Sequence, residues 1–342
     1  MMRRGWQWFV MLVGIWLGLL GGVGIAHAQG VGFTVQPVKP SNQTNTTLGY
    51  FSLRMAPQQQ QKLTIVIRNQ SSTTQRFRVR VNQAVTNANG IIDYSQADPD
   101  LDPSLQLPMK QLFSQPVQTV SVPESGAKRV TLALKMPAER LRGCALGGIY
   151  VEQLTTSHPV SHSQRKLTVN NQFAYAISIL LTESTRKVTP DLRLRQVKVG
   201  QLNQRDQVFA NLQNFEPGVL SPLSLHETVT AQNSSQVLLK QDLKSLGMAP
   251  NSNFNAALPW GNTQLKAGTY TLNLTAQSGQ RQWHFTRNFV VTPKQLRGLG
   301  GSAVTPTATP TSWLYWLLAA IIALLLAIIG YLIARNRRRK KE

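Results

Sequence analysis

This chain of 342 residues has one apolar segment near each end, and these two segments indicate the compartment in which the residues between them fold. Residues 9–26 follow Arg3 and Arg4 and end at Ala26-His27-Ala28, which is the pattern of a secretory signal peptide (1–28) cleaved after Ala28. Residues 313–334 carry no charged side chain, and at about 1.5 Å per residue they are long enough to cross a hydrocarbon core of about 30 Å. The sequence therefore predicts an exported body, 29–312, held by one C-terminal transmembrane helix.

The residues flanking the second segment predict its orientation. The tail, 335–342, carries six Lys and Arg side chains, which the positive-inside rule keeps in the cytoplasm. A stalk rich in Gly, Thr and Pro, 299–312, connects the body to the span. We therefore expect a single-pass protein of the plasma membrane whose ectodomain faces the cell wall. The alternative for residues 9–26 is an uncleaved anchor, but their many glycines make a poor membrane helix.

Charge and cysteine content narrow the class of protein further. The net charge is +22, and the exported body keeps 28 Lys and Arg against 13 Asp and Glu. Outside the cell this excess excludes nucleic acid as a partner and favours an anionic wall polymer, lipid headgroups or sulfated glycans; an ordinary solvated surface is the alternative. Cys144 is the single cysteine, so a disulfide framework is excluded, which favours a bacterial surface protein. Its neighbours Gly143 and Ala145 indicate a buried small residue rather than a reactive thiol.

The exported body reads as β-strands throughout. Residues 62–68, 77–85 and 128–136 alternate apolar and polar side chains, as half-buried strands do, and eight later runs continue the pattern. Asn89-Gly90 predicts a hairpin turn, and 104–113 is the only candidate helix before the span. The predicted fold class is all-β, with two Ig-like β-sandwich domains. The predicted core residues are Phe33, Ile65, Ile67, Val79, Leu132, Leu134 and Ile149 in the first domain and Leu194, Val208, Leu212, Leu272, Leu274 and Phe289 in the second.

The boundary between the two domains has two interpretations. The polar residues 155–166 divide the body into a first domain, 30–154, and a second, 165–298, if they form a linker. They form a hairpin loop instead if 149–153 pairs with 173–181, and the physical boundary then lies near 183–191.

No catalytic or cofactor motif is present. The sequence contains no nucleophile elbow, zinc helix, phosphate-binding loop or dinucleotide turn, so we predict no enzyme, no cofactor and no metal. His158 and His162 lie in a polar loop and read as solvated residues rather than as metal ligands. Residues 98–102 alternate three Asp side chains as a calcium loop does, but Pro103 stands where such a loop needs Gly, so an acidic loop is the better interpretation.

An ordered series of short motifs resembles the WxL-interacting proteins of Gram-positive bacteria. The first half contains FTVQP (33–37), PSNQ (40–43), TNANGIIDY (86–94), DPSL (102–105) and LGGIY (146–150), and the second half adds MAPNSNF (248–254), LKAGTY (265–270) and WHFTRNF (283–289). The resemblance covers nearly the whole body and extends to the signal, span and tail. One departure is Pro57-Gln58-Gln59, where the family more often has Pro-Gly-Gln.

The resemblance implies a first domain that binds peptidoglycan, a second that contacts host components, and small WxL-domain surface proteins as partners. Without the resemblance, the sequence indicates only a basic, membrane-anchored, all-β surface protein. Two function classes then remain: a binding protein that bridges wall, partner and host, and an assembly factor that shelters a partner's strand edges by β-augmentation. An exposed edge strand favours the second class, and a groove of aromatic and basic residues favours the first.

Two segments are candidate binding sites. In the first domain, amides of Asn42 and Gln43 and the guanidinium of Arg54 suit sugar, peptide and phosphate groups, and Arg76, Arg78 and Arg80 alternate along one strand to form a basic stripe. An ordinary solvated sheet face is the alternative there. In the second domain, the proline-bounded residues 248–260 are interpreted as a surface used in recognition through Met248, Phe254 and Trp260, with ordinary core packing as the alternative.

Overall fold

The computed structural model describes residues 32–154, 173–261 and 265–299, together with a few single positions between 318 and 332. The predicted signal peptide 1–28, the loop 155–166 with His158 and His162, the tail 335–342, and nearly all of the stalk and of the span 313–334 lie outside the described residues. Among the described residues, no helix combines the length and the apolar character needed to cross a membrane.

The regular secondary structure of the described chain is almost entirely β-strand, as the alternating runs predict. The first half contains β1 (Phe33–Val38), β2 (Phe51–Arg54), β3 (Gln60–Asn69), β4 (Gln75–Gln83), β5 (Val85–Thr86), β6 (Ile92–Asp93), the 3-10 helix η1 (Met109–Leu112), β7 (Val117–Val122), β8 (Ala127–Lys135), β9 (Cys144–Leu154) and β10 (Ala174–Thr182). The second half contains β11 (Leu192–Leu202), β12 (Arg205–Asn214), β13 (Leu220–Ala231), β14 (Val237–Met248), β15 (Ser252–Pro259), β16 (Gly268–Ser278), β17 (Arg281–Val291) and the short helix α2 (Pro293–Gly298). The all-β prediction is confirmed.

The first sandwich packs a three-stranded sheet, in the order β1-β3-β8, on a five-stranded sheet, in the order β2-β10-β9-β4-β7. Strand β10 pairs antiparallel with β9 and parallel with β2, so it belongs to this sandwich although 18 undescribed residues, 155–172, separate it from β9. Residues 183–191 then connect the two sandwiches. The Asn-Gly turn joins β5 to β6, with Gly90 in the left-handed region at a φ of 68°.

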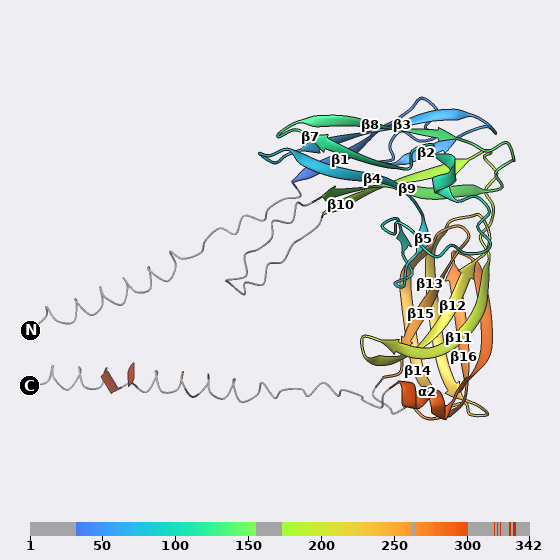
Figure 1. The fold of residues 1–342 in the computed structure, drawn as a ribbon. Coiled ribbons are helices and arrows are strands. Elements are labelled where there is room, and N and C mark those ends of the chain that lie inside the picture. The colour runs from blue at the N-terminus through green and yellow to red at the C-terminus, as the bar shows by residue number, and fades with distance from the viewer. Residues whose placement is uncertain are drawn as a thin grey trace, which may run out of the picture.

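The second sandwich packs the sheet β11-β12-β15 on the sheet β14-β13-β16-β17. Figure 1 shows the strands of this sandwich running at a steep angle to those of the first, with α2 at the end remote from the first sandwich. Helix α2 begins at Thr292, whose hydroxyl accepts from the backbone N–H of Gln295 while the Gln295 side chain accepts from the backbone of Thr292. This capping box, with Pro293 at the first helical position, forms a helix of six residues.

Each sandwich has its own apolar core. All of the core residues predicted from strand alternation are buried, the first set in the cluster around Phe33 and Phe77 and the second in the cluster around Leu272 and Leu274. In the first core the rings of Phe33 and Phe77 lie 4.8 Å apart, and Tyr175 of β10 contacts Phe33 edge-on at 5.1 Å. Together with the buried Ile177, Ile179 and Leu181, this contact makes β10 part of the first core.

Two adjacent glycines in β9 allow the segment after β6 to pack against both faces of the five-stranded sheet. A Cβ at Gly147 would lie 2.5 Å from the Met109 side chain, and one at Gly148 would lie 2.9 Å from the ring of Tyr94. Because successive residues of a strand face opposite sides, η1 covers one face of β9 and Tyr94 covers the other. The Gly-Gly pair of the LGGIY motif is therefore a packing requirement.

Among the described residues, one carboxyl group, that of Glu227, lies inside the second sandwich. Glu227 of β13 is fully buried, and its Oε2 accepts a 3.3 Å hydrogen bond from Nε2 of Gln241, which also donates to the carbonyl of Ala257. Its Oε1 has no partner among the described residues. Burial raises the pKa of Glu227 from 4.5 to about 7, and the bond from Gln241 offsets only part of this rise.

We expect the pH dependence of stability to report this carboxyl. Because the folded state binds the proton more tightly than the unfolded state, the contribution of Glu227 is most favourable below pH 4.5 and falls as the pH rises from 4.5 to about 7. Glu227→Gln should therefore raise the free energy of unfolding above pH 7, by up to about 3 kcal/mol, and flatten the profile. Urea unfolding at several pH values measures this, and Glu124→Gln, at an exposed turn, is the control. An unchanged profile for Glu227→Gln would contradict the assignment.

Candidate functional site

The basic stripe of the first domain exists as the alternation predicts. Arg76, Arg78 and Arg80 lie on the outward face of β4, while Phe77 and Val79 between them are fully buried in the core. Their cross-strand neighbours on β9 are Leu154, Glu152 and Tyr150. The stripe therefore lies on the outward face of the five-stranded sheet.

Two of the three arginines in this stripe, Arg78 and Arg80, already form ion pairs within the protein. Glu152 of β9 lies between two of the guanidinium groups, 3.5 Å from Arg78 and 3.2 Å from Arg80. Arg80 also lies over the ring of Tyr150 at 5.3 Å, and its side chain is only 16% exposed. Arg76 carries no such partner among the described residues and is exposed, so Arg76 and the half-exposed Arg78 are the groups available to a ligand.

Neither predicted amide residue of the first domain, Asn42 or Gln43, presents a side chain to a ligand. Nε2 of Gln43 donates to the carbonyls of Asn45 and Tyr50 at 3.1 and 2.8 Å, and its Oε1 accepts from the backbone N–H of Ser52 at 3.2 Å. Gln43 is therefore a loop-positioning residue with no free amide group. Both polar atoms of the Asn42 side chain are buried and have no partner in the part of the chain that the structure describes.

Arg54 lies apart from the basic stripe. It is exposed at the end of β2 and pairs in register with Thr182 of β10, whereas Glu152, the neighbour of Arg78, pairs with Ala174. These two positions of β10 are eight residues apart, which corresponds to about 26 Å along a strand. The structure does not bring Arg54 and the stripe together.

The surface interpretation of residues 248–260 is wrong for its three named side chains. Met248 is fully buried, and Phe254 and Trp260 are each 4% exposed. The segment forms the end of β14 and the whole of β15, whose alternation turns Phe254 toward the second core. The alternative interpretation, ordinary packing, holds for all three.

Asp102 joins the two sandwiches. This residue of the first half is buried, and its carboxylate accepts from Nε2 of Gln213 at 2.8 Å and from Nδ2 of Asn253 at 2.5 Å, both in the second sandwich. Arg195 approaches the same carboxylate at 3.7 Å, and Ser104 donates to it through its backbone N–H and hydroxyl. Burial alone would raise the pKa of Asp102, but the bonds from Ser104, Gln213 and Asn253 together hold it below 3.8.

Backbone and apolar contacts extend this joint. The backbone N–H of Gly247 donates to the carbonyl of Gly90 in the β5–β6 turn at 2.8 Å, and that of Cys144 donates to the carbonyl of Pro217 at 2.9 Å. The hydroxyls of Thr86 and Ser252 lie 2.6 Å apart. A small buried cluster of Ala84, Leu146 and Ala249 fills the space between. Burial raises the pKa of Cys144 to about 11, so this cysteine is an unreactive part of the joint.

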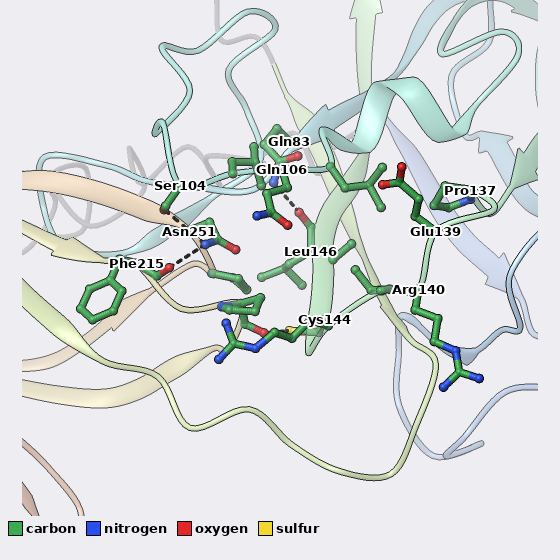
Figure 2. A pocket seen from close by; sticks show the side chains of 17 residues that line it. Gln83, Ser104, Gln106, Pro137, Glu139, Arg140, Cys144, Leu146, Phe215 and Asn251 are labelled. Carbon is green, nitrogen blue, oxygen red and sulfur yellow. Dashed lines mark hydrogen bonds between the residues drawn. The ribbon is translucent and has the colours of Figure 1, made fainter.

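A pocket of about 200 Å³ opens along the joint (Figure 2). Figure 2 shows Ser104, Asn251 and Phe215 on one side of it, and Glu139 and Arg140 on the other. The amide of Asn251 donates to Ser104 Oγ at 3.2 Å and to the carbonyl of Phe215 at 2.9 Å. Because these polar groups already bond to one another across the seam, the pocket is part of the joint rather than a ready ligand site.

The three carboxylates of the acidic loop 98–102 do not lie around a common site. Asp98 is exposed and pairs with Lys110 at 2.5 Å, Asp100 is exposed, and Asp102 turns into the joint. In the described ranges no group of three or more His, Cys, Asp or Glu side chains is placed to hold a metal ion.

The family comparison also divides the chain into two domains, with an earlier boundary than the two sandwiches have. The family model described as the WxL Interacting Protein, peptidoglycan binding domain, matches residues 33–153, and the one described as the WxL Interacting Protein, host binding domain, matches residues 164–299. The chain belongs to the WxL-interacting protein family. The peptidoglycan-binding match covers β1 to nearly the end of β9 with the basic stripe, and the host-binding match begins before β10, a strand that the pairing assigns to the first sandwich. No curated protein sequence matches this chain.

Several solved structures are similar over much of this WxL-interacting protein. A CsuC–CsuE chaperone–tip adhesion subunit pre-assembly complex from Acinetobacter baumannii contains a chain 12% identical, with 74% of this chain and 97% of that chain covered and a TM-score of 0.30. The Escherichia coli chaperone DraB is 14% identical, with coverage of 68% and 90% and a TM-score of 0.24. The Pseudomonas aeruginosa CupB2 chaperone is 11% identical, with coverage of 67% and 92% and a TM-score of 0.24.

Sequence reasoning missed the joint of this WxL-interacting protein. Asp102 belongs to the DPSL motif, and Asn251 and Asn253 belong to MAPNSNF. The hydrogen bond from Asn253 to Asp102 joins positions 151 residues apart. The only signal was the presence of polar residues inside both motifs, which does not by itself pair them.

Proposed function

We propose that this chain is a non-enzymatic surface protein that bridges wall peptidoglycan and host components and works beside WxL-domain proteins. The two family matches support a wall-binding first domain and a host-binding second domain. The proposal includes cleavage after Ala28, a single membrane span at 313–334, and an ectodomain facing the wall, all on the sequence pattern.

The observation that carries the proposal is the built joint between the two sandwiches. Both binding domains are connected through Asp102, the Gly90–Gly247 backbone bond and the Thr86–Ser252 hydroxyl pair. Such a joint holds the two binding surfaces at a fixed angle, so a partner on one domain is presented in a defined position relative to a ligand on the other.

For the first domain, we propose that the available end of the basic stripe contacts peptidoglycan. Arg76 is exposed, and Arg78 is 43% exposed despite its ion pair with Glu152. Peptidoglycan stem peptides carry carboxylates, which guanidinium groups bind through paired, charge-assisted hydrogen bonds. Arg80, at 16% exposure, then serves to position Glu152 and Tyr150 beneath the ligand.

Retention on purified sacculi tests this proposal. The full-length chain in detergent should be retained on sacculi stripped of anionic polymer, and Arg76→Gln/Arg78→Gln should bind about tenfold more weakly, since a hydrogen bond to a charged group contributes about 1.5 to 3 kcal/mol. The control is Lys240→Gln/Lys244→Gln, which removes the same charge from exposed positions of β14. No retention of the parent chain at low salt would refute the wall-binding proposal, and equal retention of both double variants would refute the stripe.

A further inference from the structure

The three-stranded sheet of the first sandwich presents a second basic face. Its outward positions come from β1, β3 and β8, because residues directly opposite one another in antiparallel strands share a face. Four of these positions are exposed cations: Lys62 and Arg68 on β3, and Arg129 and Lys135 on β8. We call this outward surface of the three strands, with its four cations, the β3–β8 face.

No acid belongs to this face. The other outward positions of the three strands are hydroxyl, amide or apolar residues: Thr34, Gln36, Val38, Gln60, Thr64, Val66, Ala127, Thr131 and Ala133. The acids nearest in sequence, Glu124 and Glu139, lie in turns beyond the two ends of β8. Among the described residues, no ion pair joins any of the four cations to a carboxylate.

The contrast with the β4 stripe decides which face suits a polyanion. Glu152 binds Arg78 and Arg80 on the stripe, so a polyanion there would have to replace an ion pair already made. On the β3–β8 face the charges face solvent and one another, and like charges on one face raise its free energy. A bound anion relieves this repulsion, which gives the β3–β8 face the larger gain from an anionic ligand.

The register spaces the cations as a strip along the strands. Lys135 pairs opposite Gln60 and lies diagonal to Lys62, while Arg129 pairs opposite Val66 and lies diagonal to Arg68. Lys62 and Arg68 are six residues apart on β3, which is about 20 Å. The face thus carries two cation pairs separated by more than one anionic group can span, a spacing suited to a linear polymer with charges repeated along its length.

Hydroxyl groups fill the gap between the two cation pairs. The hydroxyls of Thr64 and Thr131 lie 3.1 Å apart in the middle of the face, and the exposed Gln36 of β1 lies opposite Val66, the next outward position of β3. A hydroxyl can donate to a phosphate oxygen or accept from a sugar hydroxyl. Together the strip offers charge at both ends and neutral hydrogen-bonding groups between, with Val66 as the apolar contact.

The position of the face in the fold selects a wall polymer over the membrane. The five-stranded sheet and its loops carry Ala84, Asp102 and Cys144, which contact the second sandwich. The β1-β3-β8 sheet is the opposite layer, and Figure 1 shows it on the side of the first sandwich away from the second sandwich and α2. In the proposed topology the span follows α2, at the end of the second sandwich remote from this face, which favours a wall polymer over lipid headgroups as the ligand.

We propose that the β3–β8 face binds an anionic wall polymer whose repeating unit carries a phosphodiester, such as a poly(glycerol phosphate) teichoic acid. This site is separate from the peptidoglycan contact of the β4 stripe, and the inference rests on the proposed function only for the location of the domain at the wall. The polymer lies along the strands, with phosphates near the Lys62–Lys135 and Arg68–Arg129 pairs and its glycerol units over Thr64 and Thr131.

Binding of the full-length chain to purified poly(glycerol phosphate) tests the proposal. The parent chain should bind, and log Kd should rise with log salt, because each neutralised phosphate releases counterions. The variant Lys62→Gln/Arg68→Gln/Arg129→Gln/Lys135→Gln should bind at least tenfold more weakly and lose roughly three units of the salt slope. The matched control is Lys198→Gln/Lys240→Gln/Lys244→Gln/Lys266→Gln, which removes four exposed cations from the second domain and should bind as the parent does.

Three outcomes would overturn the proposal. These are no binding of the parent to the polymer at low salt, equal loss in both quadruple variants, and loss in the β3–β8 variant on vesicles containing phosphatidylglycerol but not on the polymer. A neutral dextran and circular dichroism of each variant separate charge-specific binding from misfolding. Because the proposed peptidoglycan contact is measured on sacculi stripped of this polymer, its failure and the failure of the β3–β8 face give different results.

Discussion

Replacing Trp260 by Ala is expected to lower the free energy of unfolding by about 3 to 5 kcal/mol. Trp260 follows the last residue of β15, is 4% exposed, and contacts the ring of Tyr270 edge-on at 5.1 Å. Tyr270 in turn stacks on Phe289 at 5.6 Å, so the three rings close the second core together. Removing the indole leaves a cavity against both sheets. A loss of this size is a large share of the roughly 5 to 15 kcal/mol that stabilises a typical domain.

Urea unfolding of the full-length chain in detergent, followed by tryptophan fluorescence and circular dichroism, measures this loss. The control is Val290→Ala, since Val290 follows Phe289 on β17 but is 58% exposed; its effect should stay within about 0.5 kcal/mol. If Trp260→Ala kept the stability of the parent and lost only ligand binding, the packing assignment would be wrong and the surface interpretation of residues 248–260 would return.

The error at residues 248–260 has a physical cause. Pro250 and Pro259 suggested irregular structure, but Pro250 lies in the turn before β15 and Pro259 is its last residue, so the prolines bound a strand instead of interrupting it. The inward positions of β15 include Ser252 and Ala256, which are polar or small. The apolar-polar alternation typical of a strand is therefore weak in this segment.

The cores could be predicted because most strands have one covered face and one exposed face. In β3 and β4, residues 63–67 and 77–81 alternate buried with partly exposed side chains, and a period of two is enough to assign the core. Strand ends were less accurate: β14 extends from Val237 to Met248, where the sequence predicted only 237–239, because residues 240–245 are mostly polar and the strand is irregular there, with Ser245 at a φ of 59°. The candidate helix at 104–113 is confined to the 3-10 turn Met109–Leu112.

The candidate site could be predicted in part. Alternation placed Arg76, Arg78 and Arg80 on one face, but the ion pairs with Glu152 depend on the register between β4 and β9, which local sequence does not determine. The β3–β8 face depends in the same way on the register that brings Arg129 beside Arg68. Strand pairing determines which charged side chains, distant in the sequence, become neighbours on one face.

Replacing Asp102 by Ala is expected to loosen the joint between the two sandwiches. The side chain is 1% exposed, and its removal leaves the amides of Gln213 and Asn253 without their shared acceptor. Each buried donor left unsatisfied costs about 1 to 3 kcal/mol. The free energy of unfolding should fall by roughly 2 to 6 kcal/mol in total. Small-angle X-ray scattering should show a larger maximum dimension as the angle between the sandwiches becomes variable.

Acid should reproduce the effect of this substitution in the parent chain. Because the pKa of Asp102 is held below 3.8 in the folded state, its contribution to stability is complete above that value and is lost as the pH falls through the lowered pKa. The parent should keep its compact scattering profile at pH 4 and expand below it, whereas Asp102→Ala should be expanded at both. Asp100→Ala, two residues away and exposed, removes the same charge and should behave as the parent does. If Asp102→Ala scattered as the parent does at neutral pH, the angle between the domains would be held by the Gly90–Gly247 and Cys144–Pro217 backbone bonds instead, and Asp102 would stabilise the joint without setting its geometry.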